Sequence, residues 1–284
     1  MKLSHIDGGK PFDWDRASDD YAKFRDIYPN SFYKKIVDFG LCKRDQHILD
    51  LGTGTGVLPR HLSTYGASFV GVDISENQIA RAKELSKGRG IEYIAAPAED
   101  IDFPDGTFDN ALACQCYIYF DQNALLPKLY KALKPEGRFC VMSLIWLHEE
   151  SPIAAASEAL VLEYNPSWSG AGFTRPKFNN RGIPSGFDID TSLGFEVDFS
   201  YSFDIPISFT REKWHGRIRA CRGIGASSMT EKEIAAFDAE HIAFLEKQRA
   251  SFKIMHSAVF CVLKKYSLDD LTAGQIFHKH VLGV

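Results

Sequence analysis

The chain has 284 residues, of which 45% are hydrophobic and 25% are charged. This composition is ordinary for a globular protein and excludes a disordered or collagen-like chain; no run approaches 18 consecutive apolar residues, which argues against a membrane span. The 33 Lys and Arg residues against 37 Asp and Glu give a formal net charge of −4, which disfavours a protein that holds nucleic acid mainly through its phosphates.

The N-terminus has no apolar stretch of the signal-peptide type. The six cysteines are widely spread and form no CxxC pair. A chain of this length does not need disulfides for stability, so we expect free thiols and a cytoplasmic protein.

The predicted elements begin with helical pieces over residues 12–40. From residue 47 short apolar runs alternate with segments of helical spacing. Strands are predicted at 47–52, 68–75, 91–98, 108–116 and 138–146, with helices at 57–66, 75–88 and 123–137. This alternation suits right-handed crossovers and a parallel sheet.

The regular alternation stops near residue 147. Residues 148–192 are rich in Pro, Gly, Ser and Asn, which predicts an irregular cap over one end of the sheet. A strand is then predicted at 194–206, helices at 210–222 and 230–250, and an antiparallel last strand at 251–265.

Together these elements predict one α/β domain over residues 1–284. Its Rossmann-like, seven-stranded sheet is mostly parallel, with helices on both faces, an antiparallel last strand and a cap inserted between strands five and six. We expect a helical cover at 1–40, a ligand-binding core at 41–147, the cap at 148–192, the rest of the sheet and its helices at 193–266, and a tail at 267–284.

A glycine-rich turn, DLGTGTG, follows the first predicted strand at residues 50–56. Its glycines let the backbone turn tightly and approach a ligand without a Cβ in between. Asp73 ends the second predicted strand, 21 residues after Gly52, where a carboxylate can accept hydrogen bonds from both hydroxyls of a ribose. The pattern predicts a nucleoside site, with a tight turn and an N-capping Asp as the structural alternative.

Two nucleotide motifs are missing from this turn. A dinucleotide fingerprint needs glycine at position 57, which is Val57, and no GK[ST] sequence follows for a triphosphate. A nucleotide-linked dehydrogenase is therefore disfavoured.

Four segments, HILDLGTGTG, VGVDIS, AAPAEDIDFPDGTFDNALACQC and LKPEGRFCV, resemble the successive motifs of the class I S-adenosylmethionine-dependent methyltransferases of small-molecule type. The resemblance covers roughly residues 20–147. It implies the fold of that family and S-adenosylmethionine as cofactor, with S-adenosylhomocysteine as product. A sulfonium cofactor without phosphate also explains why the loop carries no lysine, because a cation favours aromatic faces and carboxylates.

The resemblance also assigns cofactor contacts along the chain. The methionine and ribose parts would lie along Asp50, Gly52, Thr53, Gly54 and Gly56; the ribose would bind Asp73, and the adenine would meet Ile74, Ala98 and Glu99; Gln115 would face the methionine amino group, and Tyr21 and Arg25 the methionine carboxylate.

Candidate catalytic residues follow the fourth and fifth strands or lie on the 210–222 helix: Tyr117, Tyr119, His148 and His215. Candidate acceptor-binding residues are Trp146, Trp214, Arg219 and Arg222. His215, Arg219 and Arg222 recur at i, i+4 and i+7 on a helix that also carries Trp214 and Arg217, a face that could hold an anion; a solvated face with surface ion pairs is the alternative. No metal is expected, because Cys114 and Cys116 supply too few ligands.

We therefore expect methyl transfer to a small molecule, anionic acceptors included, in a pocket enclosed by the cap. The composition disfavours a tRNA or protein methyltransferase. The absence of an NPPY turn after strand four and the pI of 6.1 disfavour DNA as a partner. A non-catalytic protein that binds the cofactor stays open, as do the acceptor atom (O, N, S or C) and the choice between monomer and homodimer.

Overall fold

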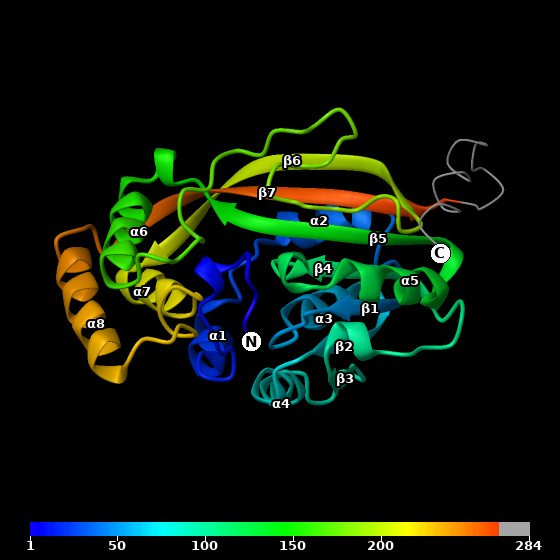
Figure 1. Cartoon of the computed structure of the whole chain (residues 1–284), viewed down its shortest axis with the longest axis horizontal. Helices are drawn as coiled ribbons and strands as arrows, with labels where there is room; N and C mark the ends of the chain where they lie inside the picture. The colour runs from blue at the N-terminus through cyan, green and yellow to red at the C-terminus, as the bar shows by residue number, and fades with distance from the viewer. Residues whose placement is uncertain (267–284) are drawn as a thin grey trace.

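A computed structural model of the chain describes residues 1–266, and seven strands in that range form one sheet (Figure 1). Their bounds are β1 His47–Leu51, β2 Ser68–Asp73, β3 Glu92–Ala95, β4 Phe108–Cys114, β5 Leu133–Trp146, β6 Phe195–Thr210 and β7 Ser251–Lys265. The order across the sheet is β3-β2-β1-β4-β5-β7-β6. Strand β7 is antiparallel to both of its neighbours, and each other neighbouring pair is parallel. The predicted fold class is confirmed.

Helices cover both faces of the sheet, because adjacent residues of a buried strand point to opposite sides. Ile48 of β1 packs with α2 (Asn30–Asp38) and α3 (Val57–Leu62), whereas Leu49 packs with α5 (Gln122–Ala132). Helix α4 (Glu76–Leu85) connects β2 and β3. These crossovers bring the carboxyl ends of the parallel strands to one edge of the sheet, where open α/β sheets bind their ligands.

A further group of helices lies beyond the carboxyl end of β5 (Figure 1). It consists of α1 (Ser18–Phe24), α6 (Pro152–Tyr164), α7 (Arg211–Arg219) and α8 (Glu231–Glu246). The last three share a core around Trp146, Trp214 and Phe237. Gly216 of α7 has no side chain where the ring of Phe24 packs, so α1 sits directly against α7.

Several boundaries differ from the sequence prediction, and two of the differences change the type of element. Residues 152–164 of the expected irregular cap form the helix α6, because the Pro, Gly, Ser and Asn residues concentrate after it and Pro152 is favourable at a helix start. Helix α5 ends at Ala132 rather than at residue 137. Leu133 already pairs with Phe108 of β4, and Pro135 and Gly137 disfavour a continued helix.

All six cysteines lie within the described range and are free thiols. In residues 1–266 no helix combines the length and the apolar character needed to cross a membrane. The predicted tail, residues 267–284, lies outside the described residues.

Candidate active site

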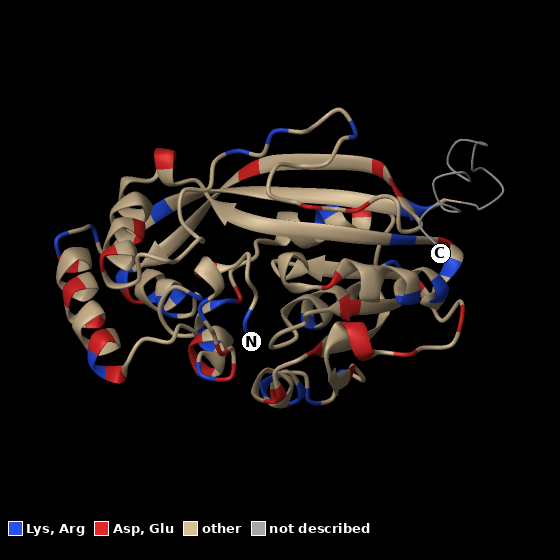
Figure 2. Cartoon of the chain, viewed as in Figure 1, with Lys and Arg blue, Asp and Glu red and all other residues tan. Residues whose placement is uncertain are grey.

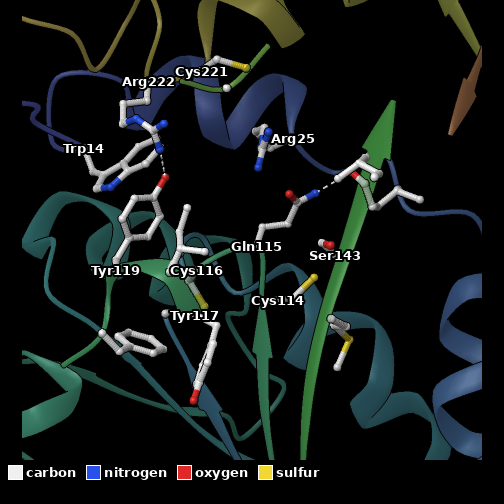
Figure 3. A pocket seen from close by; sticks show the side chains of 18 of the residues that line it. Trp14, Arg25, Cys114, Gln115, Cys116, Tyr117, Tyr119, Ser143, Cys221 and Arg222 are labelled. Atoms are coloured by element: carbon white, nitrogen blue, oxygen red, sulfur yellow. Dashed lines mark hydrogen bonds between the residues drawn. The ribbon is translucent and has the colours of Figure 1, made fainter. Parts of the chain in front are cut away.

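A cavity of about 360 Å³ lies at the carboxyl ends of the parallel strands. Gly52, Asp73, Gln115 and Ser143, from β1, β2, β4 and β5 or directly after them, line it. In Figure 3 the side chains from the ends of β4 and β5 face Arg25, from the end of α1, across this space. The cavity therefore lies where the sheet topology predicts a ligand.

The glycine loop contributes bare backbone to one wall of the cavity. Gly52 and Gly54 line it with positive φ angles of 62° and 55°, a conformation that side chains disfavour. A Cβ on Gly52 would lie 2.7 Å from the Cβ and Sγ of Cys116, and one on Gly54 would lie 3.3 Å from the ring of Tyr21. Glycine is thus required both by the turn and by the close approach of its neighbours.

Asp73 meets this loop directly. Its Oδ2 accepts a hydrogen bond from the Gly54 N–H and its Oδ1 one from the Ser75 N–H, both at 2.9 Å. Burial raises the pKa of Asp73, while these two hydrogen bonds act in the opposite direction. Each carboxylate oxygen has a second lone pair, so the carboxylate can still accept hydrogen bonds from a ligand.

Three other residues of the glycine loop, Asp50, Thr53 and Gly56, do not line the cavity. Asp50 is 2% exposed and accepts a hydrogen bond of 2.6 Å from the Thr53 hydroxyl. Burial raises the pKa of Asp50 to about 7, and nearby Asp73 adds to this effect. Gly56 is the N-cap residue of α3, with a φ of 72°, and packs against Tyr93. These residues therefore stabilise the conformation of the loop.

Ile74, Ala98 and Glu99, for which the resemblance implies adenine contacts, line the same cavity as Asp73. Ile74 is 48% exposed, so its side chain presents an apolar surface to this space. Glu99 accepts a hydrogen bond of 2.8 Å from the N–H of Asp121, the N-cap residue of α5. This bond fixes one carboxylate oxygen at the rim.

Tyr21, Arg25 and Gln115, for which the resemblance implies methionine contacts, also line the cavity. The Arg25 guanidinium lies 4.8 Å from the centre of the Tyr21 ring. Gln115 has a φ of 66°, unusual for a residue with a side chain, and its Nε2 donates to the Leu144 carbonyl at 2.8 Å. Figure 3 shows Arg25 and Gln115 pointing toward the same space.

The two candidate catalytic tyrosines diverge (Figure 3). Tyr119 accepts a hydrogen bond of 2.5 Å from Nη1 of Arg222, and burial raises its pKa to about 12. The Tyr117 hydroxyl donates a hydrogen bond of 2.7 Å to Oε1 of Gln122, and burial raises the pKa of Tyr117 as well. Both phenols are therefore neutral near pH 7, and neither can act there as a strong base.

Neither candidate histidine lines the cavity. His148 lies outside the lining, with Nδ1 4.0 Å from Glu158. His215 lies within hydrogen-bonding distance of His241, their Nδ1 atoms being 3.0 Å apart. Among the described residues that line the cavity there is no histidine, and residues 1–266 contain no group of three or more His, Cys, Asp or Glu residues that could hold a metal ion.

The predicted acceptor-binding face of α7 does not form. The helix ends at Arg219, so Arg222 lies beyond it and lines the cavity from the following turn. Arg219 lies outside the lining and is held by Asp20, at 3.2 Å, and by Asp238. His215, Arg219 and Arg222 do not share one helix face, because α7 ends about one turn earlier than predicted.

The two candidate tryptophans take different places. Trp146 lines the cavity, and its Nε1 donates to Glu158 at 2.5 Å. Trp214 is fully buried beside it, with ring centres 5.6 Å apart, and its Nε1 donates to Ser157. Trp214 is therefore a core residue rather than a contact for a ligand.

Arg217 lines the cavity, although it is not among the site residues predicted from the sequence. It lies three residues after Trp214 and one before Ile218, both fully buried. Helical spacing places all three on one side of α7. A cation on the apolar side of a helix is the signal that could have identified it.

Comparisons with known proteins agree on the type of domain. Residues 49–141 match the family model described as a methyltransferase domain. Over 114 residues the chain is 37% identical to a demethylmenaquinone methyltransferase of Thermus thermophilus. The match covers 38% of this chain and 52% of that protein. Over 132 residues it is 30% identical to the O-methyltransferase resE of Aspergillus sclerotiorum, covering 44% and 50% respectively. The chain thus spans about half the length of the curated relatives it matches.

A solved structure shares the fold over more of the chain. Phosphoethanolamine N-methyltransferase 2 of Haemonchus contortus, in complex with phosphomonomethylethanolamine and S-adenosylhomocysteine, aligns with a TM-score of 0.51 and 19% identity. The alignment covers 88% of this chain and 58% of that protein. At this identity the likeness concerns the fold.

Proposed function

We propose that the chain is a class I S-adenosylmethionine-dependent methyltransferase, which binds S-adenosylmethionine in this cavity and methylates a small molecule. The match of residues 49–141 to a methyltransferase domain supports this proposal. The observation that carries the proposal is the hydrogen bond from the Gly54 N–H to Asp73. It joins a glycine loop and an acid at a strand end, beside a cavity of suitable size. This is the arrangement that a ribose requires.

The residues present fit the adenosyl part of the cofactor. The free lone pairs of Asp73 suit the two ribose hydroxyls, because a carboxylate accepts about four hydrogen bonds in all and this one already accepts two within the protein. Ile74 offers an apolar surface on which an adenine can pack.

The residues also fit the methionine part. The Arg25 guanidinium suits a carboxylate, and the Gln115 amide suits an ammonium group through its oxygen, since its nitrogen is engaged by Leu144. The ring of Tyr21 lies next to Arg25. The bend with positive φ at Gln115 places that side chain in the cavity.

S-adenosylmethionine would supply a methyl group: an acceptor lone pair would bond to the methyl carbon in line with the carbon–sulfur bond, whose electrons would return to sulfur as S-adenosylhomocysteine leaves. The work of the protein would be to hold the acceptor atom behind the methyl carbon and away from water. Such positioning can lower a barrier by roughly 7–11 kcal/mol. The described lining of the cavity contains no histidine, and burial keeps the phenols of Tyr117 and Tyr119 neutral near pH 7 by raising their pKa. We therefore infer an acceptor atom that reacts without a strong protein base.

The cavity favours a small acceptor over a macromolecule. Two segments outside the sheet contribute to its lining: the N-terminal segment through Met1 and Trp14, and the 148–192 segment through Trp168 and Phe173. Both segments therefore help to enclose the cavity. Acidic and basic residues are mixed on α4 and α8 (Figure 2), which differs from the one-sided basic surface of a nucleic-acid binder. Two of the relatives are also named for small acceptors.

A thermal-shift titration tests the cofactor. S-adenosylmethionine and S-adenosylhomocysteine should raise the melting temperature in a concentration-dependent way, whereas NAD and ATP at the same concentrations should not, because only a bound ligand stabilises the folded state. Equal stabilisation by NAD would overturn the assignment.

A further inference from the structure

Arg217 is a buried cation without a carboxylate partner among the described residues. It is 2% exposed. Its Nη1 donates to the Sγ of Cys221 at 3.0 Å, and its Nε is buried without a hydrogen-bond partner. Buried arginines are normally paired, because an uncompensated charge in the interior is costly. The exception therefore requires an explanation.

Neighbouring arginines show the usual pattern. Arg219, two residues further on, pairs with Asp20 and Asp238. Arg222 pairs with Asp7 in a contact whose side chains are 7% and 6% exposed. The fold thus supplies carboxylates for Arg219 and Arg222 and leaves Arg217 without one among the described residues.

A second cation increases the imbalance. Arg25 also lines the cavity and makes no ion pair within residues 1–266. Burial, together with the charge of Arg25, lowers the pKa of Arg217 to about 10. Arg217 therefore stays protonated near pH 7, and two positive charges face the same space. The methionine carboxylate of the cofactor can neutralise Arg25 and leaves Arg217 for another anion.

The surroundings of Arg217 describe the rest of that ligand. The guanidinium lies 4.7 Å from the centre of the Trp146 ring, which holds it in place by a cation–π contact. Trp168 and Phe173 line the same cavity. A guanidinium presents its donors in a fork that matches an oxyanion, and the aromatic walls suit an apolar body.

We propose that Arg217 binds an oxyanion group, a carboxylate or a phosphate, of the methyl acceptor, whose remainder is apolar. The inference rests on the proposed function, and it replaces the surface of His215, Arg219 and Arg222 as the place where an anionic acceptor binds. Arg217 would act as a binding residue that orients the acceptor.

The test uses the full chain saturated with S-adenosylhomocysteine, titrated by calorimetry with sodium phosphate and with sodium benzoate. Benzyl alcohol and sodium chloride at matched ionic strength are the ligand controls. The variants are Arg217→Met and Lys213→Met, which remove one positive charge each from α7; Lys213 is exposed. We expect wild type and Lys213→Met to bind at least one of the two anions at least tenfold more tightly than Arg217→Met does.

The same variants separate this proposal from its alternatives. S-adenosylhomocysteine should bind Arg217→Met within threefold of wild type; a loss of tenfold or more would assign Arg217 to the cofactor and overturn the proposal. Equal anion binding by Arg217→Met, or none by wild type, would also overturn it. If Arg217→Met does not fold, Arg217→Lys replaces it and should weaken anion binding by losing the forked donors.

Failure of the proposed function would look different. If S-adenosylhomocysteine did not bind wild type, the methyltransferase assignment and the Arg217 subsite would fall together. If it binds and only the anion titrations fail, the cofactor site stands and the subsite is wrong.

Discussion

The backbone N–H of Gly54 donates a hydrogen bond of 2.9 Å to the Oδ2 of Asp73, which ends β2. Through this bond the glycine loop after β1 and the acid at the end of β2 form one wall of the cavity. Gly52 and Gly54 contribute only backbone to this wall, so the carboxylate of Asp73 beside them is the group that can accept hydrogen bonds from a ribose. The predictions about the cofactor follow from this pair.

Asp73→Ala should weaken the binding of S-adenosylhomocysteine by about 1–3 kcal/mol, the usual cost of losing a charged hydrogen-bond acceptor. That corresponds to roughly five- to 150-fold in Kd. Isothermal titration calorimetry measures the change. Asp102→Ala, which removes an exposed acid, is the matched control and should bind like wild type. Unchanged affinity in Asp73→Ala would mean that the ribose is held elsewhere.

Gly52→Ala should destabilise the protein more than Gly88→Ala. Both glycines have positive φ, at 62° and 81°, but a Cβ on Gly52 would lie 2.7 Å from Cys116, whereas nothing lies within 4 Å of one on Gly88. The collision should add at least about 1 kcal/mol to the shared backbone strain. Urea unfolding of the two variants gives the difference, and equal losses would contradict the close contact.

The collision can also be relieved. Cys116→Gly removes both atoms that a Cβ on Gly52 would meet. The Gly52→Ala/Cys116→Gly double variant should therefore lose less free energy of unfolding than the two single variants lose in sum. Strict additivity would show that the two positions do not touch.

Asp50 should make the stability of the ligand-free protein depend on pH. Its folded-state pKa of about 7 lies above the value of about 3.9 in an unfolded chain. Between these values the folded state binds more protons than the unfolded state, so the contribution of Asp50 to stability falls as pH rises from about 4 to 7. Asp50→Asn keeps an oxygen for the Thr53 hydroxyl and removes the titration.

Urea unfolding at pH 5, 6, 7 and 8 measures this contribution as the difference between the variant and wild type. Asp50→Asn should gain stability relative to wild type toward pH 8, because wild type must then bury a charged carboxylate beside Asp73. A difference that does not change with pH would show that Asp50 titrates normally.

The central fold could be predicted because its strands are short apolar runs of the chain itself. β1 and β4 are buried on both faces, and their sequences alone indicate this. The end of α5 could not be placed, since Leu133 joins β5 through its pairing with Phe108, 25 residues earlier in the chain. Helix α6 could not be predicted from the average composition of residues 148–192, because the Pro, Gly, Ser and Asn residues after it dominate that average.

The site divides in the same way. Gly52, Gly54 and Asp73 follow local patterns, and the structure brings them together as expected. The charges on and after α7 depend on distant residues: Asp20 lies 199 positions from Arg219, and Asp7 lies 215 positions from Arg222. Because these partners are distant in the sequence, the local pattern does not show that Arg219 and Arg222 are paired with carboxylates and that Arg217 is not.

The buried pair of Asp7 and Arg222 should contribute strongly to the stability of the N-terminal cover. Asp7 also accepts hydrogen bonds of 2.7 and 2.9 Å from the N–H and hydroxyl of Ser169, so it joins the N-terminus to the 148–192 segment beside the cavity. Asp7→Ala would leave Arg222 buried and without its carboxylate, which typically costs about 3–5 kcal/mol. Asp13→Ala removes an exposed acid of the same segment and should change the free energy of unfolding by less than about 0.5 kcal/mol. Similar unfolding curves for the two variants would show that Asp7 does not hold the cover in place.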